Sequence, residues 1–417
     1  MDPIILLQGK RLLLGVTGSI ACYKAVDLAS KLTQAGAQVD VIMTEAAQKF
    51  VTPLTFQSVT GRAVYTDMWT PAAGSDLPTH IAHIGLGEGA DLFAIIPATA
   101  DTLARLAGGF ARDLLAVTAL AARCPLLIAP AMDGGMYANP AVQANLETLR
   151  ARGAFVVEPD VGRFASGLVG KGRLPETPDL IGAIRLVLGQ NGALAGRRVV
   201  ITAGGTREAV DPVRYISNRS SGKQGYALAQ AALDAGAQVT LISAARHLPE
   251  PLGALVVPVD TAVQMRDAVL AHAVEADADV LIMAAAVADY RPKHAAEQKI
   301  KKLGGEELTL DLVQNPDILM EVKARRARTH RPRLAVGFAA ESEHTIEHGR
   351  EKLIRKGLEM LIANDISAAD AGFEVDTNRV ILLTADATEP LALMRKTEVA
   401  EAIIARVALL LGNGKTP

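Results

Sequence analysis

Short apolar runs alternate with amphipathic stretches along the first half of the chain. Mostly apolar runs occupy residues 12–16, 38–43, 92–96 and 125–129. Runs of this kind are typical of parallel strands that are buried on both faces of a sheet. A helical pattern follows the first run, over residues 20–35. The alternation predicts a doubly wound α/β domain.

The same pattern begins again after a segment rich in glycine and small polar residues, 188–196. Such composition is typical of a linker. Five further strands are predicted beyond it, at residues 199–201, 238–242, 278–283, 334–338 and 360–363. With 417 residues, the chain is also too long for one typical hydrophobic core. We therefore predict two Rossmann-like domains, residues 1–190 and 191–417.

Composition and charge exclude several classes of protein. Half of the residues are hydrophobic and 21% are charged, as in well-packed globular proteins, and the net charge is only −2. This charge gives no general attraction to nucleic acid or to a membrane. No apolar run reaches the roughly 18 residues that span a bilayer, and two cysteines cannot form a disulfide framework. We predict a cytoplasmic protein that binds neither nucleic acid nor membrane.

The most informative segment for function follows the predicted strand at 199–201. It contains two loops, Gly204-Gly-Thr-Arg207 and Ser217-Asn-Arg-Ser-Ser-Gly-Lys223. Together they offer backbone N–H groups, hydroxyls and positive charges, which are the groups that bind phosphates. Arg207, Arg214, Arg219 and Lys223 supply the charge. A nucleotide or a phosphorylated substrate is the predicted ligand.

A second candidate loop, Gly15-Val-Thr-Gly-Ser-Ile-Ala21, leads from the first predicted strand into a helix. It lacks the G-x-G-x-x-G spacing of a dinucleotide-binding loop. The phosphate of a mononucleotide is therefore the better guess. An ordinary two-domain nicotinamide dehydrogenase is disfavoured for the same reason.

Several motifs, taken in order, resemble the bacterial family of bifunctional coenzyme A biosynthesis enzymes, in which phosphopantothenoylcysteine decarboxylase is fused to phosphopantothenate–cysteine ligase. In the second half the motifs are 201–208 with 220–223, 284–292, 299–302, 315–319, 336–341 and 376–379. In the first half, 15–21 and 97–101 resemble flavin-containing cysteine decarboxylases. The resemblance covers nearly the whole chain. It implies a flavodoxin-like FMN-dependent decarboxylase domain over 1–190 and a CTP-dependent ligase domain over 191–417.

For the ligase half, the resemblance implies that CTP and Mg²⁺ activate phosphopantothenate as an acyl-cytidylate, which cysteine then attacks. Asn218 would handle this intermediate, and Arg214 and Lys223 would bind the substrate. Asp289 would bind nucleotide or metal, although it could also cap a helix. Lys352 and Lys356 would share a helix face, which could also be a solvated surface. The implied nucleotide contacts are Met283, Ala284, Ala285, Asp289, Lys299, Pro316, Asp317, Ile318, Leu319, Phe338, Lys352 and Lys356.

For the decarboxylase half, the resemblance implies FMN contacts at Gly18, Ser19, Ile20, Thr44 and Thr99. Oxidation of the substrate thiol to a thioaldehyde makes the adjacent carboxylate a leaving group. His83 matches the family's active-site histidine, a residue suited to moving a proton near neutral pH. His80, three residues earlier, is a rival on the same face of a predicted helix.

Two positions depart from the family pattern, and both lie in segments implied to bind the substrate. In Pro130-Ala-Met-Asp-Gly-Gly-Met136, Asp133 stands where the family has asparagine, and Met136 completes the motif. In Ala165-Ser-Gly-Leu-Val-Gly-Lys-Gly-Arg-Leu174, Ser166 replaces a cysteine that donates a proton. Because a hydroxyl is a weaker acid than a thiol, two hypotheses stay open. The chain is either bifunctional, or a ligase whose first domain is a flavin-binding oligomerisation scaffold. The resemblance also implies a homo-oligomer with trimeric flavin domains and dimeric ligase domains.

Overall fold

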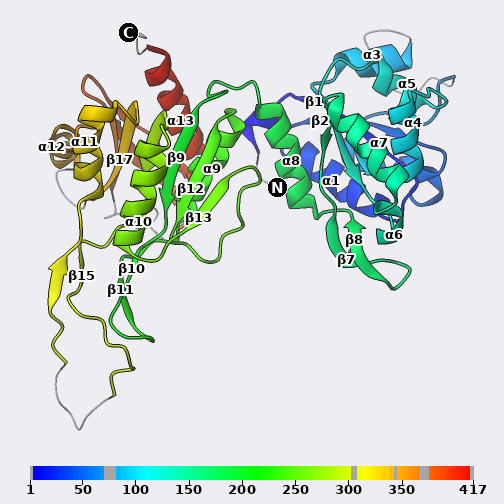
Figure 1. Cartoon of the computed structure of the whole chain (residues 1–417). Helices are drawn as coiled ribbons and strands as arrows, with labels where there is room; N and C mark the ends of the chain where they lie inside the picture. The colour runs from blue at the N-terminus through cyan, green and yellow to red at the C-terminus, as the bar shows by residue number, and fades with distance from the viewer. Residues whose placement is uncertain (1–2, 70–80, 302–307, 342–344, 366–374, 414–417) are drawn as a thin grey trace. The chain divides into compact units, whose positions relative to one another are not determined.

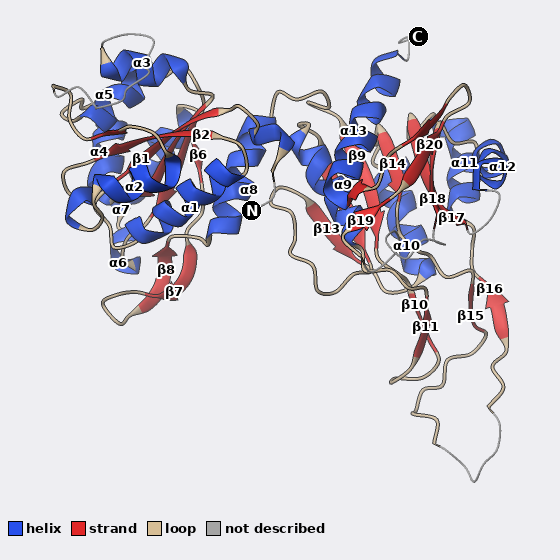
Figure 2. Cartoon of the chain, turned by 180° about the vertical axis from the view of Figure 1, so that it is seen from behind, coloured by secondary structure: helices blue, strands red, loops and turns tan. Residues whose placement is uncertain are grey.

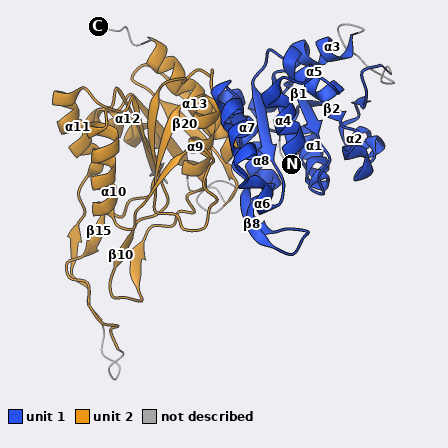
Figure 3. Ribbon diagram, turned by 45° about the vertical axis from the view of Figure 1, so that its right-hand side comes forward, with its two compact units in different colours: residues 1–189 blue, residues 190–417 orange. Residues whose placement is uncertain are grey.

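The computed structural model describes residues 3–69, 81–301, 308–341, 345–365 and 375–413. The chain divides into two compact units, Met1–Gly189 and Gln190–Pro417 (Figure 3). Each unit is built around one large sheet with helices on both faces (Figure 1). This arrangement confirms the predicted fold class of two doubly wound α/β domains.

The sheet of the first unit is entirely parallel, with the order β3-β2-β1-β4-β5-β6. This is the Rossmann strand order, in which the chain reverses its direction of winding between β1 and β4. The carboxyl ends of these two strands therefore flank the place where ligands bind in such sheets. The strands are β1 Arg11–Val16, β2 Gln38–Met43, β3 Val64–Tyr65, β4 Leu92–Ala98, β5 Leu126–Pro130 and β6 Phe155–Val156.

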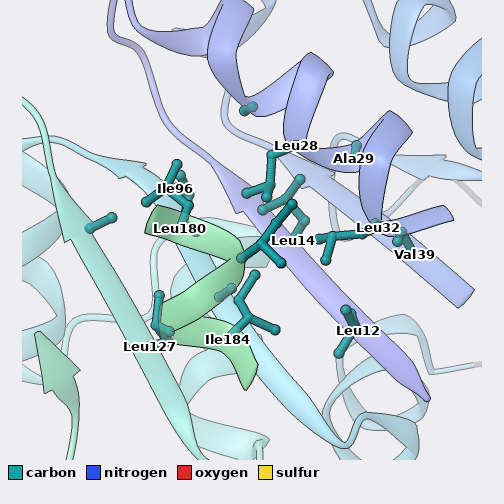
Figure 4. Close-up of a cluster of buried hydrophobic side chains, with 14 of the residues drawn as sticks. Leu12, Leu14, Leu28, Ala29, Leu32, Val39, Ile96, Leu127, Leu180 and Ile184 are labelled. Carbon is teal, nitrogen blue, oxygen red and sulfur yellow. The ribbon is translucent and has the colours of Figure 1, made fainter. Parts of the chain in front are cut away.

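Both faces of the first sheet are covered because its strands are apolar on both sides. Leu12 and Leu14 of β1 pack on one face with Leu28 of α1 and Leu180 of α8 (Figure 4), whereas Leu13 packs on the other face. Each buried leucine stabilises the fold by about 1.5–3 kcal/mol. The covering helices are α1 Cys22–Gln34, α2 Pro53–Thr60 and α8 Thr177–Gly189 on the first face, and α3 Ala82–Gly89, α4 Ala100–Gly108, α5 Leu114–Ala121 and α7 Pro140–Ala151 on the second.

Several smaller elements complete the first unit. Helix α6, Gly134–Tyr137, follows β5 directly, and short 3₁₀ turns lie at Ile5–Leu7 and Ala47–Lys49. Strands β7, Asp160–Arg163, and β8, Val169–Arg173, form an antiparallel hairpin apart from the main sheet. The hairpin contacts α6. It therefore carries Ser166, at its turn, to the same region as Asp133, which begins α6.

The sheet of the second unit has eight strands in the order β13-β12-β9-β14-β17-β18-β20-β21. Its first six strands are parallel and repeat the Rossmann order, and its last two are antiparallel. The strands are β9 Arg198–Ala203, β12 Gln238–Ser243, β13 Leu255–Pro258, β14 Val280–Met283, β17 Leu334–Glu341, β18 Met360–Asp365, β20 Val380–Leu383 and β21 Thr388–Pro390.

Helices and three short ribbons surround this second sheet (Figure 2). The helices are α9 Lys223–Asp234, α10 Ala262–Val269 with a π-helical continuation at Leu270–Glu275, α11 Ile318–Thr329, α12 Thr345–Lys356 and α13 Lys396–Asn413. Helices α9 and α13 pack against each other. The ribbons are β10 Arg207–Ala209 with β11 Tyr215–Ser217, β15 Tyr290–Pro292 with β16 Leu312–Gln314, and β19 Thr377–Asn378 with β22 Met394–Arg395.

Candidate functional site

Two adjoining cavities open at the carboxyl ends of β14 and β17 in the second unit. The larger one has a volume of about 550 Å³ and the smaller one of about 210 Å³. They share Ala285, Val287, Asp289, Phe338 and Lys352 as lining residues. This edge is where open α/β sheets bind their ligands. The two cavities therefore form one elongated site with distinguishable ends.

The structure brings most of the predicted ligase residues to these cavities. Asn218, Lys223 and Ala284 line the larger cavity, whereas Met283, Lys356 and the segment 316–319 line the smaller one. Two predicted residues lie elsewhere. Lys299 is exposed and lines neither cavity, and Arg214 lies beside the turn of the β10–β11 ribbon.

Hydrogen bonds between consecutive loops hold the walls of the larger cavity. Thr202 and Thr206, at the end of β9, accept backbone N–H groups of Ala285 and Ala288 at 3.1 and 2.9 Å. Gly204 has a φ of +85°, and a Cβ there would lie 2.5 Å from the backbone nitrogen of Ala245. Only glycine fits such a position. Glycine is therefore required at position 204, because the backbone of Ala245 passes so close to it.

Asn218 and Asp289 both line the larger cavity. The amide nitrogen of Asn218 donates to the carbonyl oxygen of Val287 at 3.0 Å. Because an amide group has two N–H donors, this bond orients the side chain while the second donor can serve a ligand. Asp289 is exposed and precedes strand β15, so the alternative that it caps a helix is wrong. Asp317 is the residue that caps a helix, since it accepts the N–H of Met320.

Both lysines of helix α12 face the ligand cavities, as their spacing predicted. Lys356 is buried and forms an ion pair with Asp317. Lys352 donates to the carbonyl oxygen of Phe338 at 3.4 Å. The alternative of a solvated helix face is therefore wrong for Lys356. Two cations at this end suit a polyphosphate, and the exposed carboxylate of Asp289 suits Mg²⁺, which binds one or two carboxylates beside phosphate oxygens.

Arg214 forms an ion pair with the buried carboxylate of Asp211 and lines neither cavity. Asp211 accepts the backbone N–H groups of Val213, Arg214 and Ile300, and also the Arg214 guanidinium. Burial raises the pKa of Asp211, but these donors outweigh it and lower the pKa from 3.8 to about 2. The bonds join the turn of the β10–β11 ribbon to the segment that follows β15.

We expect acid to loosen this ribbon before the core. A carboxyl group whose pKa is depressed in the folded state stabilises the structure above its unfolded pKa, and the stabilisation disappears as the pH falls from about 4 through about 2. Hydrogen-exchange protection factors of the Val213 and Ile300 amides should therefore fall in this range, ahead of those in β9. Asp211→Asn should weaken their protection at neutral pH. Unchanged protection of both amides in the acid series and in the Asp211→Asn variant would contradict the role of Asp211 in holding the ribbon.

Sequence reasoning missed several residues that line the larger cavity. Gln224, Asn364, Asn378 and Lys396 come from four different elements, α9, β18, β19 and α13. Side-chain oxygens of Gln224 and Asn364 are buried and have no hydrogen-bond partner within the described part of the chain. The motif 220–223 ends beside Gln224 and the motif 376–379 contains Asn378, but neither motif assigned a role to these residues.

The first unit holds a second site at the carboxyl ends of β1, β2 and β4. The predicted FMN contacts Gly18, Ser19, Ile20, Thr44 and Thr99 all follow these strands. Thr17 joins two of the loops, because its hydroxyl donates to the carbonyl of Pro97 at 2.7 Å and accepts the N–H of Thr99 at 3.0 Å.

Two features of these loops fit a mononucleotide phosphate. A Cβ at Gly18 would lie 2.4 Å from the Cβ of Ala46, so the loop has no space for a side chain. Thr99 caps the amino end of α4, and such a helix end attracts anions. Close backbone approach and a helix terminus together make a cradle of the kind that binds phosphate.

A cavity of about 360 Å³ lies beside this loop and brings the two unusual residues together. Its lining includes Ser19, Ile20, Asp133 and Ser166. The hydroxyl of Ser166 donates to Oδ2 of Asp133 at 2.8 Å, while Oδ1 of Asp133 accepts the N–H of Gly135. Met136 is exposed on α6. The two departures from the family pattern are thus direct partners.

His83 lies in α3 and is not among the residues that line this cavity. The structure therefore does not bring it to Asp133 and Ser166 within one chain. His80 lies outside the described residues. A search of the described residues also finds no helix that is long and apolar enough to cross a membrane and no group of three acidic, histidine or cysteine side chains placed to hold a metal.

The fold and the two sites define a flavoprotein domain joined to a nucleotide-binding domain of pantothenate metabolism. Residues 6–189 match the family model described as "Flavoprotein", and residues 194–410 match "DNA/pantothenate metabolism flavoprotein C-terminal domain". The chain is 45% identical to the coenzyme A biosynthesis bifunctional protein CoaBC of Vibrio cholerae serotype O1, over 95% of this chain and 98% of that protein. It belongs to this family of bifunctional coenzyme A biosynthesis proteins.

Solved structures resemble each half separately. The crystal structure of the C-terminal domain of a coenzyme A biosynthesis bifunctional protein CoaBC is 36% identical, covering 53% of this chain and 99% of that chain with a TM-score of 0.45. The crystal structure of the FMN-dependent cysteine decarboxylase SpaF is also 36% identical, covering 43% of this chain and 99% of that chain with a TM-score of 0.36.

Proposed function

We propose that this chain makes 4′-phosphopantetheine in two steps of coenzyme A biosynthesis. The second unit joins phosphopantothenate to cysteine with CTP, and the first unit decarboxylates the product. Membership of the bifunctional family supports both activities. The single observation that carries the ligase assignment is that the nucleotide contacts expected from the sequence, Lys299 excepted, line one elongated site.

In the ligase step, the substrate carboxylate attacks the α-phosphorus of CTP and pyrophosphate leaves. Lys352 and Lys356 bind the nucleotide phosphates, and Asp289 would hold a Mg²⁺ ion, which would offset the negative charge of the phosphates. Asn218 donates to the acyl oxygen when the cysteine amine attacks the acyl-cytidylate and CMP leaves. The hydrogen bond from Asn218 to the carbonyl oxygen of Val287 fixes the orientation of this donor before the substrate binds.

In the decarboxylation step, FMN supplies oxidation of the substrate thiol and later returns the electrons. The loops containing Gly18, Ser19 and Thr99 hold its phosphate, and Ile20 and Thr44 complete that side of the site. Asp133, Met136 and Ser166 form the substrate end. His83 moves a proton. Since His83 does not line the cavity of its own chain, we propose that an oligomer of flavin domains completes the site, with the trimer as the predicted form and dimeric ligase domains beside it.

The second candidate function is a ligase whose first unit only binds flavin and supports assembly. The bond between Ser166 and Asp133 favours it, because both side chains are engaged with each other at the substrate end. Retention of the FMN cradle by the first unit favours the bifunctional enzyme.

Mass spectrometry of products separates these functions. The purified chain is incubated with phosphopantothenate, cysteine, CTP and Mg²⁺. We expect 4′-phosphopantetheine together with released CO₂. Accumulation of phosphopantothenoylcysteine would support the scaffold function instead, whereas accumulation of its enethiol would mean that the first unit decarboxylates the substrate but does not complete the reduction. If no CTP-dependent product forms, both proposals fail.

A further inference from the structure

A buried asparagine that the ligase mechanism does not use lies at the nucleotide end of the site. Asn315 begins the motif 315–319, lines the smaller cavity and is only 8% exposed. A polar side chain is costly to bury unless its hydrogen-bonding groups find partners. The partners of Asn315 therefore indicate what the residue does.

Both polar atoms of the Asn315 side chain are hydrogen-bonded, and their partners are of opposite kinds. The amide nitrogen donates to the carbonyl oxygen of Ala288 at 2.8 Å. The amide oxygen accepts a hydrogen bond from Nη1 of Arg291, in β15, at 2.8 Å. Because a carbonyl oxygen only accepts and a guanidinium only donates, these partners determine the orientation of the amide. Neither aspartate nor leucine could make both bonds.

The backbone of Asn315 adds a third hydrogen bond to the same loop. Its N–H donates to the carbonyl oxygen of Asp289 at 2.8 Å. Asn315 thus binds two consecutive carbonyl oxygens, those of Ala288 and Asp289. On the other side, the hydroxyl of Thr206 accepts the N–H of Ala288 at 2.9 Å. The backbone of this loop is therefore fixed from both sides.

The fixed loop carries the carboxylate that is proposed to bind Mg²⁺. The side chain of Asp289 is exposed and lines both cavities. With its backbone fixed, only the side-chain torsions of Asp289 must be ordered when a metal binds, which lowers the entropic cost of binding. Hydrogen bonds that orient a metal ligand typically change metal affinity by about 10–100-fold. The contacts of Asn315 are therefore of the kind that strengthens a metal site.

The same short segment also holds the opposite wall of the smaller cavity. Asp317 caps helix α11 and forms an ion pair with Lys356 of α12. Asp289, the proposed metal ligand, and Lys356, a proposed phosphate-binding residue, are thus both attached to residues 315–317. The segment therefore sets the separation of these two groups.

We propose that Asn315 is a positioning residue of the ligase, which holds Asp289 in place for the Mg²⁺ ion that accompanies CTP, and that Arg291 acts through Asn315 by fixing its amide. The inference rests on the proposed function, in which Asp289 binds the metal. It extends that function to a residue that need not touch the nucleotide. It also gives a physical reason for an asparagine at the start of the motif 315–319.

Asn315→Leu tests this inference in the full chain. The measurement is the calorimetric Kd for CTP without the other substrates, once with Mg²⁺ and once with EDTA. We expect the Kd with Mg²⁺ to rise about tenfold to a hundredfold and the Kd with EDTA to change less than about twofold, because the lost bonds orient a metal ligand. A side chain needed only for the shape of the cavity would change both values. Gln230→Leu, which removes an amide bonded to Asp234 within α9, is the matched control and should change neither.

Arg291→Met is a milder second variant, since this side chain is only partly buried. Loss of its hydrogen bond to Asn315 should raise the Kd for CTP with Mg²⁺ about two- to tenfold. Because Arg291 acts through Asn315, adding Arg291→Met to Asn315→Leu should cause no further rise, and effects that multiply would overturn the role of Arg291. If Asn315→Leu fails to fold, Arg291→Met decides the inference alone, and an unchanged Kd overturns it.

Asp289→Asn separates this inference from the function on which it rests. If the unmodified chain makes no CTP-dependent product, the proposed function itself fails. If the product forms but Asp289→Asn leaves the Kd with Mg²⁺ unchanged, Asp289 does not hold the metal, and the inference fails with that assignment. If Asp289→Asn weakens binding and Asn315→Leu, shown to be folded by thermal unfolding, does not, only the role of Asn315 is overturned. Added to Asp289→Asn, Asn315→Leu should raise this Kd no further.

Discussion

Replacing His83 with asparagine is expected to lower the decarboxylation rate by about 10²–10⁴-fold, the usual contribution of a general acid or base. Ligation should be unaffected, because His83 belongs to the first unit and the nucleotide cavities belong to the second. The measurement is the rate of CO₂ release from supplied phosphopantothenoylcysteine, beside the rate of CTP-dependent pyrophosphate release. Bound FMN should stay at the level of the unmodified protein.

His80→Asn is the matched control for this prediction. It removes the rival histidine three positions earlier, and we expect it to leave decarboxylation within a few fold of the unmodified rate. If His80→Asn causes the large loss and His83→Asn does not, the assignment of His83 is wrong. A His83→Asn subunit mixed with an Asp133→Ala subunit further tests a shared site, since partial recovery of activity requires residues from different chains to act together.

Replacing Asn218 with alanine is expected to lower kcat for ligation by about 10²–10³-fold, the usual cost of removing one preorganised donor to a developing oxyanion. The side chain lines the larger cavity and is oriented by its bond to Val287. Decarboxylation of supplied phosphopantothenoylcysteine should continue at its normal rate. This second activity controls for the amount of intact chain, and retained affinity for CTP shows that the second unit is folded.

The stage at which the Asn218→Ala variant stops identifies the role of the side chain. Accumulated acyl-cytidylate, detected by mass spectrometry after acid quenching, would mean that Asn218 serves the attack by cysteine. Loss of pyrophosphate release would mean that it serves formation of the intermediate. Full activity in both partial reactions would remove Asn218 from the mechanism.

Much of the fold could be predicted from hydrophobic patterning. The strands β1, β2, β4 and β5 and their counterparts in the second unit are present where apolar runs indicated them, because central parallel strands must be apolar on both faces. The edge strands β3, β6 and β13 have only two, two and four residues, so they give weak signals. The antiparallel strands β20 and β21 were missed because nothing in a local pattern specifies which neighbour a strand joins.

The structure brings predicted site residues together where they follow one strand directly. The loops after β1 and β9 lie at the ligand edge because parallel strands all end there. Lys396 and Asn364 escaped prediction, since each is one polar residue in a late element and only the packing of α13 on α9 and of β18 on β17 brings them to the cavity. His83 is the opposite case. Its motif resembles that of the family, but His83 does not line the cavity that contains Asp133 and Ser166 in its own chain.

The amino-acid sequence was sufficient for the fold class, the positions of the glycine-containing loops and the family, because these depend on local periodicity and on contiguous motifs. Only the tertiary structure decided that Asp133 and Ser166 are hydrogen-bonded partners, that Arg214 serves Asp211, and that Lys223 and Lys396 lie at one end of the ligand site. Each of these facts joins side chains from different elements. Such contacts depend on how the elements pack, which short-range sequence patterns do not encode.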